Sequence, residues 1–237
     1  MTGNAGQPAV LFESCVDTVD AAVASEAGGA GRIELCARLE VGGTTPNVAL
    51  VERCVAAVRI PVFTMVRPRG GSFAYDAAEA DVMVRDIAAL KAAGARGLVF
   101  GALTRDDTID VTLMARLSAA AQPLPVTCHR AIDAARNLHE ALDELLGLGV
   151  DRVLTSGGAP SAAQGAAAIA ALVRQAGDAL VVMAGGGVRA ANVGALVRAT
   201  GVREVHAGLL GLPAASAEKD ATAAQARIAE FVGRLRG

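Results

Sequence analysis

The chain has 237 residues, of which 53% are hydrophobic and 19% charged, and no shift in composition or long linker divides it. These values favour a single globular domain with a large apolar core. A net charge of −2, the absence of a basic run and an aromatic content of 3% argue against nucleic acid or an anionic membrane as a partner.

The first eight residues are polar and lack the positive start and apolar stretch of a signal peptide. We therefore expect a disordered N-terminal tail at residues 1–8 and one domain over residues 9–237. No segment approaches the ~18 consecutive apolar residues of a membrane span. The four cysteines contain no CxxC pair, which favours free thiols in a reducing compartment. Together these features predict a cytoplasmic protein that contacts no membrane.

Short apolar stretches rich in β-branched residues are typical of buried strands, and they alternate with longer stretches that have capping residues at the start and glycine at the end. Strands are expected at residues 9–15, 32–36, 62–67, 97–101, 125–129, 152–155, 180–184 and 203–207. Helices are expected at about residues 18–27, 47–58, 76–93, 111–121, 137–148, 161–176, 189–200 and 217–236.

Strict alternation of strand and helix implies parallel pairing with right-handed crossovers. Eight such units in roughly 200 residues predict an α/β fold of the (β/α)8 TIM-barrel type, as a single domain. A doubly wound open sheet is the competing fold. It would carry a dinucleotide-binding fingerprint after its first strand, and residues 13–17 (ESCVD) contain none.

Alternate residues of a barrel strand point inward, and functional groups collect at the carboxyl-terminal rim. Counting in steps of two predicts a polar cluster in the inner, upper barrel, formed by Glu13, Glu34, Arg67, His129, Thr155 and His206. Burying these groups without partners would cost several kcal/mol each, so they must pair with one another, with a ligand or with water. The purely structural alternative is a salt-bridge network of Glu13 and Glu34 with Arg67 and Arg130.

Arginines and glycine-rich turns suggest an anion site. Arg67 and Arg69 flank Pro68 where a strand breaks into a loop, and guanidinium groups suit carboxylate or phosphate. The alternative is that both arginines bind loop carbonyls and surface acids. Glycine-rich turns after the sixth and seventh strands would leave backbone N–H groups free for an anion. The candidate anion-binding residues are Arg67, Arg69, Arg130, Asp133, Ser156, Gly157, Gly186, Gly187 and His206.

The remaining ionisable and soft side chains support two further interpretations. Glu13 or Glu34 with His129 could form an acid–base pair for proton transfer, as in an isomerase or a lyase. Alternatively, Cys15 and Cys36 could bind Cu(I), together with the thioether of Met65 and the imidazoles of His129 and His206, because soft ligands select that ion. A buried cysteine is also often only a small hydrophobic residue.

Several motifs together resemble the CutC family. They are residues 34–37 (ELCA), 42–46 (GGTTP), 66–71 (VRPRGG) with Phe73 and Tyr75, 129–133 (HRAID), 153–157 (VLTSG), 183–189 (MAGGGVR) with Asn192, and 204–206 (EVH). The resemblance runs from about Val10 to His206 and implies a cytoplasmic (β/α)8 barrel, often a homodimer, in copper tolerance or Cu(I) handling. It also implies that Cys15 and Cys36 are the counterparts of cysteines proposed as copper ligands in some members.

The sequence thus leaves alternative hypotheses for function. One is a cytoplasmic copper homeostasis protein of the CutC family that binds Cu(I). Another is a TIM-barrel enzyme that acts on a small phosphorylated or carboxylated metabolite, with Glu13, Glu34 and His129 as the candidate acid–base groups. A third is a barrel that acts mainly through protein contacts.

Overall fold

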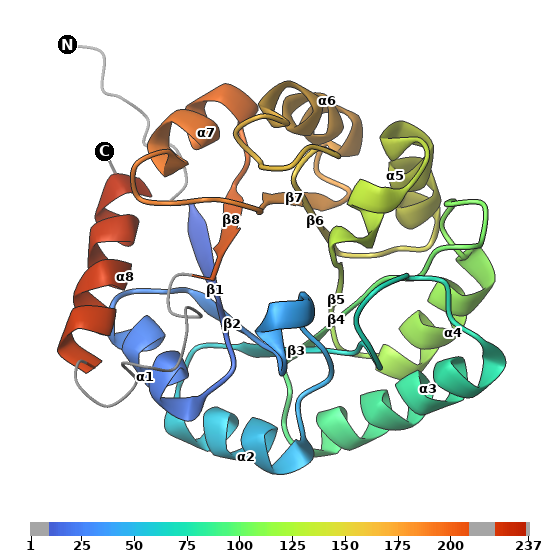
Figure 1. The fold of residues 1–237 in the computed structure, drawn as a ribbon, viewed down its shortest axis with the longest axis horizontal. Helices are drawn as coiled ribbons and strands as arrows, with labels where there is room; N and C mark the ends of the chain where they lie inside the picture. Colours follow the sequence, from blue (N-terminus) through green and yellow to red (C-terminus); the bar gives the residue numbers. More distant parts are fainter. Residues whose placement is uncertain (1–9, 209–220, 236–237) are drawn as a thin grey trace.

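A closed barrel of parallel strands, surrounded by helices, makes up the structure (Figure 1). The computed structural model describes residues 10–208 and 221–235. The strands are β1 (Leu11–Val16), β2 (Arg32–Leu35), β3 (Val62–Met65), β4 (Gly97–Phe100), β5 (Val126–Cys128), β6 (Arg152–Thr155), β7 (Val181–Ala184) and β8 (Glu204–Ala207). Each strand pairs with the next, and β8 closes the ring on β1. The predicted single-domain (β/α)8 barrel is therefore confirmed.

One helix follows each strand. They are α1 (Val19–Ala27), α2 (Val48–Ala57), α3 (Ala77–Ala92), α4 (Val111–Ala121), α5 (Leu138–Gly147), α6 (Ala166–Ala176), α7 (Val193–Thr200) and α8 (Ala221–Leu235), with 3-10 turns η1 (Leu39–Val41) and η2 (Arg130–Ala134). Side-chain caps fix several of the starts. Thr18 accepts a hydrogen bond from the backbone N–H of Ala21, and Asp76 forms a reciprocal capping box with Glu79.

Two helices begin later than the sequence predicts. We expected α6 from residue 161, but Gly165 lies so close to the carbonyl of Ser156 that a Cβ atom there would be 1.9 Å from the oxygen. The segment before Gly165 is therefore a turn packed on the β6 loop. We expected α7 from Arg189, but the Asn192 side chain accepts from the Arg189 backbone N–H and closes a loop first.

Two parts of the prediction lie outside the described residues: the disordered tail at residues 1–8 and the start of the last helix at residues 217–220. Within the described part of the chain, no helix combines the length and apolar character needed to cross a membrane.

The strands separate two apolar layers, as the period of two predicts. An outer layer between strands and helices includes Phe12, Leu35, Val66, Val126 and Val205. A small inner cluster, enclosed by the strands, consists of Cys15, Cys36, Phe63, Met65 and Val99. The apolar part of the barrel interior is therefore small, and charged side chains fill much of the remainder.

Candidate functional site

Four charged side chains form what we call the ionic network inside the barrel: Glu13, Arg32, Arg152 and Glu204. Arg32 bridges Glu13 and Glu204, and Arg152 forms a forked pair with Glu204 through Nε (2.6 Å) and Nη2 (3.1 Å). Both guanidinium groups also lie over the ring of Phe63. Two cations and two anions balance one another, so the network is complete without a ligand.

Nearer the carboxyl ends of the strands lies a second group, which we call the thiol cluster: Cys15, Glu34, Cys36 and His206. The two Sγ atoms are 4.0 Å apart, and the Cys36 thiol donates to Glu34 Oε2 at 3.4 Å. His206 Nε2 lies 3.8 Å from the same carboxylate oxygen, while its Nδ1 is 2.8 Å from Glu13 Oε1. Glu13 therefore links the thiol cluster to the ionic network.

Two sets of potential metal ligands overlap here. One ligand atom each from Cys15, Glu34 and Cys36 lies within 4.8 Å of the others, and the same holds for Glu13, Glu34 and His206. All five side chains are buried or nearly so. The first set combines two thiols with a carboxylate, and the second offers only oxygen and nitrogen.

The charges in this region follow from burial and close contacts. Burial alone would raise the pKa of Glu13, but the His206 imidazole and the Arg32 guanidinium together lower it to about 2. The hydrogen-bonding contact with Cys36, aided by His206 and opposed by burial, lowers the pKa of Cys15 to about 5. At neutral pH the barrel therefore holds a Glu13 carboxylate and a Cys15 thiolate.

The other members of the thiol cluster shift in the opposite sense. Burial and the neighbouring Cys15 raise the pKa of Glu34 well above its usual range. The same Cys15 contact, together with burial, raises the pKa of the Cys36 thiol. Burial would lower the pKa of His206, but Glu34, Cys15 and Glu13 outweigh it and raise the value well above normal. His206 is thus an imidazolium beside a thiolate, and its protonated nitrogens cannot ligate a metal.

A third sulfur atom lies close to the thiols. A Cβ atom at Gly43, which has φ +85°, would meet Cys36 Sγ at 3.1 Å and Met65 Cε at 3.5 Å. Gly43 therefore lets its loop approach both sulfur-bearing side chains. Leu39 of η1 packs against the same inner cluster. The cluster is thus covered from above by the loop that follows β2.

The Nη groups of Arg67 and the guanidinium of Arg69, two arginines of the predicted anion site, donate to the protein. Arg67 Nη1 donates to the carbonyls of Val41 and Gly43, and Nη2 donates to that of Gly71, all at 2.9 to 3.0 Å. Arg69 pairs with Glu79 and donates to nearby loop carbonyls. These contacts are those of the alternative interpretation, in which the arginines bind loop carbonyls and surface acids.

The predicted anion-binding turn after β6 is filled by a side chain. The Asp133 carboxylate accepts from the backbone N–H groups of Ser156 (3.0 Å) and Gly158 (3.1 Å), and Arg130 pairs with it at 2.7 Å. Thr155, expected in the barrel interior, also donates its hydroxyl to Asp133. That expectation was wrong. Arg152 points into the barrel, and because side chains along a strand alternate between its two faces, Thr155, three residues further on, points outward.

The remaining residues of the predicted anion site lie near this turn. The Gly157 N–H donates to Thr155 Oγ1 at 2.8 Å. A Cβ atom at Gly186 would lie 3.3 Å from the guanidinium carbon of Arg130. The carbonyl of Gly187 accepts a hydrogen bond from the Asn192 side chain. His206 is the exception, because it belongs to the thiol cluster.

The histidine of the predicted acid–base pair is not the one that lies beside the two glutamates in the structure. The histidine beside Glu13 and Glu34 is His206, whereas His129 Nδ1 accepts from the backbone N–H of Ala131 at 3.2 Å. The register explains this, since Glu13 of β1 lies directly opposite His206 of β8. The salt-bridge alternative also named the wrong cation, because the partner of Glu13 is Arg32 rather than Arg67 or Arg130.

Sequence reasoning missed the two arginines of the ionic network. Arg32 stands two residues before Glu34, and Arg152 two residues before Leu154, so a step of two along each strand would have placed both inside the barrel. They were overlooked because each is the first residue of its strand, where a charged residue ordinarily marks a solvent-exposed end.

Comparison with known proteins identifies relatives. The CutC family model matches residues 10–211. The "Copper homeostasis protein cutC homolog" of Mus musculus is 50% identical over 196 residues, 83% of this chain and 72% of the mouse protein, and the Homo sapiens homologue is 49% identical over the same shares. A crystal structure named as a putative copper homeostasis protein CutC, from Streptococcus agalactiae, superposes with a TM-score of 0.80 at 32% identity, covering 83% of this chain and 97% of that one.

Proposed function

This chain belongs to the CutC family of copper homeostasis proteins, and from that premise we propose that it binds Cu(I) through Cys15 and Cys36 inside the barrel. The observation that carries the proposal is the 4.0 Å separation of the two Sγ atoms. Two thiolates that share one ion at the ~2.3 Å length of a metal–thiolate bond can be at most about 4.6 Å apart. The pair therefore accommodates a bridging ion without backbone movement.

The donor set favours a soft, monovalent ion. Thiolate and thioether ligands select Cu(I), and Met65, a third soft group, packs in the same inner cluster as Cys15 and Cys36. Hard divalent ions such as Mg²⁺ prefer oxygen ligands, but here the Glu13 carboxylate is already paired with Arg32, and burial raises the pKa of the Glu34 carboxyl group. The chemistry of the cluster thus agrees with the names that the relatives carry.

Binding would be coupled to proton release. Cys15 is ready as a thiolate, whereas the raised pKa of Cys36 means that its proton must leave when the ion enters. Glu34 Oε2, 3.4 Å from that sulfur, accepts the hydrogen bond of the thiol and lies in the path of the departing proton. The His206 imidazolium offsets part of the negative charge of two thiolates.

The setting of this function is the cytoplasm, whose reducing conditions keep thiols free and copper monovalent. All four cysteines of the chain are free and buried, which agrees with that compartment. The homodimer stays a prediction.

Anaerobic titration with Cu(I) against a competing chelator tests the proposal. We expect the wild type to take Cu(I) from the chelator, and both Cys15→Ser and Cys36→Ser to bind at least about tenfold more weakly, because each loses one of two covalent-type ligands. Cys54→Ala and Cys128→Ala are the matched controls, since both thiols are buried in the outer layer, away from the inner cluster. Equal affinity in all five proteins would contradict the proposal.

A further inference from the structure

Three buried polar atoms in the segments that follow β3 and β5 have no hydrogen-bond partner among the described residues. They are Nε of Arg67, Nε2 of His129 and the hydroxyl of Tyr75. Arg67 is 5% exposed and His129 is 4% exposed, so solvent does not compensate these groups. A buried donor left unsatisfied destabilises the fold, because it has lost its hydrogen bonds to water and gained none in return. Two buried N–H donors without an acceptor in one neighbourhood, those of Arg67 and His129, indicate a missing acceptor rather than isolated imperfections.

The tautomer of His129 determines whether its Nε2 atom donates or accepts a hydrogen bond. Its Nδ1 accepts a hydrogen bond from the backbone N–H of Ala131, so Nδ1 carries no proton. Burial and the nearby Arg67 guanidinium lower the pKa of His129 to about 3, which keeps the ring neutral. The single ring proton of a neutral imidazole must then be on Nε2. Nε2 of His129 and Nε of Arg67 are therefore both hydrogen-bond donors, and neither has an acceptor among the described residues.

The charge of Arg67 has no counterpart in the described part of the chain. Its Nη1 and Nη2 groups donate to three backbone carbonyls. No ion pair joins Arg67 to another described residue. Buried arginine elsewhere in this barrel is neutralised by carboxylates, as Arg32 is by Glu13 and Glu204. An uncompensated buried cation with a free donor is therefore incomplete without an anion.

The donors are gathered around one aromatic ring. The Arg67 guanidinium carbon lies 4.8 Å from the ring centre of Phe73, and the His129 ring centre lies 5.0 Å from it. Arg67 is also close enough to Tyr75 to oppose the rise that burial causes in the pKa of that hydroxyl. The guanidinium of Arg67 and the imidazole of His129 thus both contact the ring of Phe73, and Arg67 is close enough to His129 to affect its pKa.

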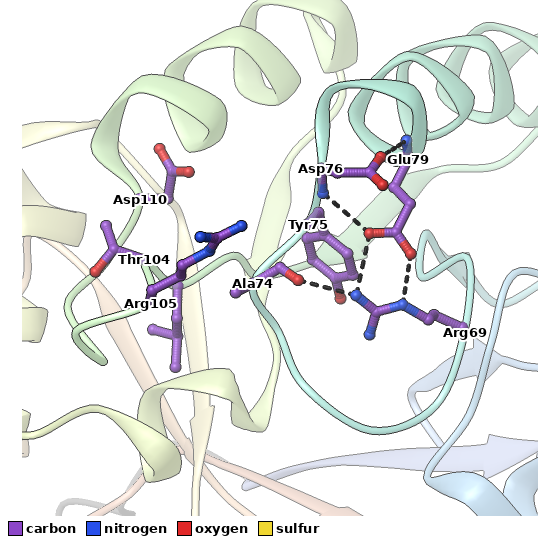
Figure 2. Close-up of a pocket in the computed structure, with 9 residues that line it drawn as sticks. Arg69, Ala74, Tyr75, Asp76, Glu79, Thr104, Arg105 and Asp110 are labelled. Atoms are coloured by element: carbon purple, nitrogen blue, oxygen red, sulfur yellow. Dashed lines mark hydrogen bonds and ion pairs between the residues drawn. The ribbon is translucent and has the colours of Figure 1, made fainter.

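Tyr75 also lines a cavity of about 580 Å³ between the loops that follow β3 and β4 (Figure 2). The acids of this cavity are already engaged: Asp76 and Asp110 cap α3 and α4, and Glu79 pairs with Arg69 beside Tyr75 (Figure 2). Arg105, in contrast, is exposed and has no recorded ion pair with another described residue. Of the three residues with unsatisfied atoms, Tyr75 lines this cavity, and Arg105 leaves one unpaired cation beside it.

We infer that Arg67, His129 and Tyr75 bind a small carboxylate monoanion at the rim of the barrel, separate from the thiol cluster. One guanidinium charge balances one negative charge, and the two oxygens of a carboxylate can accept from Nε of Arg67 and Nε2 of His129 together. A phosphate monoester, which carries about −1.5 to −2 charges at neutral pH, would leave excess negative charge in a buried site with one cation. The inference extends beyond copper binding and does not depend on it.

NMR of the imidazole nitrogens tests this site directly in metal-free protein, because the chain has only three histidines. Acetate is the probe, and chloride at the same ionic strength is the control. We expect acetate, but not chloride, to shift the His129 Nε2–H signal saturably. The signal of His139, an exposed side chain bonded to Gln175, should stay in place.

Variants assign the effect to the named donors. His129→Asn removes the Nε2 donor but keeps an oxygen that can accept from the Ala131 N–H, and we expect about tenfold weaker acetate binding by calorimetry. Tyr75→Phe removes only a hydroxyl and should weaken binding several-fold. Ser118→Ala is the matched control, because that hydroxyl is also unpartnered but lies in α4. It should bind acetate like the wild type.

Three outcomes would overturn the inference. The first is a His129 signal unmoved by acetate, which would mean that water satisfies these donors. The second is an equal shift with chloride, which would show screening rather than binding. The third is a response to inorganic phosphate but not to acetate, which would make the carboxylate assignment wrong. Since no copper is added, failure of the Cu(I) proposal would leave all these readings unchanged.

Discussion

The ionic network and the thiol cluster occupy the same barrel interior, and they differ in whether they are complete. In the ionic network every charge has an opposite charge at contact distance. The thiol cluster has surplus ligands: two thiols 4.0 Å apart and a Glu34 carboxylate whose Oε1 has no hydrogen-bond partner. Both are buried, so burial alone does not distinguish a structural group from a binding group.

The difference is the basis for proposing an ion site at the thiol cluster rather than at the ionic network. A balanced set of charges gains nothing from a further ion, because any added charge would disturb the pairing. A set with an ionised thiolate, a neutral thiol and a spare carboxylate oxygen can gain a cation and release a proton. We therefore expect changes in the ionic network to alter stability first, and changes in the thiol cluster to alter ion binding first.

The largest effect should follow from Arg32→Met. The change leaves Glu13 without its guanidinium partner and removes one of the two cations on Glu204. Breaking a buried pair in this way costs about 3–5 kcal/mol in the free energy of unfolding. Urea denaturation measures this loss. If the dependence of the unfolding free energy on urea concentration is the same in both proteins, the two values can be compared directly.

An exposed ion pair supplies the control for that change. Arg203 pairs with Asp178, and their side chains are 70% and 86% exposed. Arg203→Met should change the free energy of unfolding by no more than about 0.5 kcal/mol. If Arg32→Met were as mild as Arg203→Met, the ionic network would not be a structural element, and the contrast drawn above would be lost.

A smaller effect is expected in the titration of the thiol cluster. Because the pKa of Cys15 is lowered to about 5, the thiolate should persist at neutral pH and disappear as the pH falls through that value. The ultraviolet absorbance of the thiolate, taken as the difference between wild type and Cys15→Ser in metal-free protein, measures this directly. A difference signal that appears only near the ordinary cysteine value of 9 would show that Cys36 and His206 do not stabilise the thiolate.

Much of the fold could be predicted because its signals are local. Apolar stretches mark the strands, and Thr18, Asn47 and Asp76 mark helix starts through side-chain caps that the structure contains. The late starts of α6 and α7 could not be predicted in this way. They depend on contacts with the loops after β6 and β7, such as the approach of Gly165 to Ser156, which only the closed barrel creates.

The sequence predicts which side chains of the site face the barrel interior, but not which of them lie next to one another. A period of two placed Glu13, Cys15, Glu34 and Cys36 inside the barrel, which the structure confirms. The choice of His206 over His129 as the neighbour of Glu13 requires the register between the first and last strands. No local pattern contains that register, because it is set by closure of the ring.

X-ray absorption at the copper edge of the Cu(I)-loaded protein tests the central claim most directly, since it reports which atoms surround the ion. The account predicts at least two sulfur neighbours in the wild type, and loss of sulfur coordination in the Cys15→Ser, Cys36→Ser double variant. A copper ion surrounded only by nitrogen and oxygen in the wild type would contradict it.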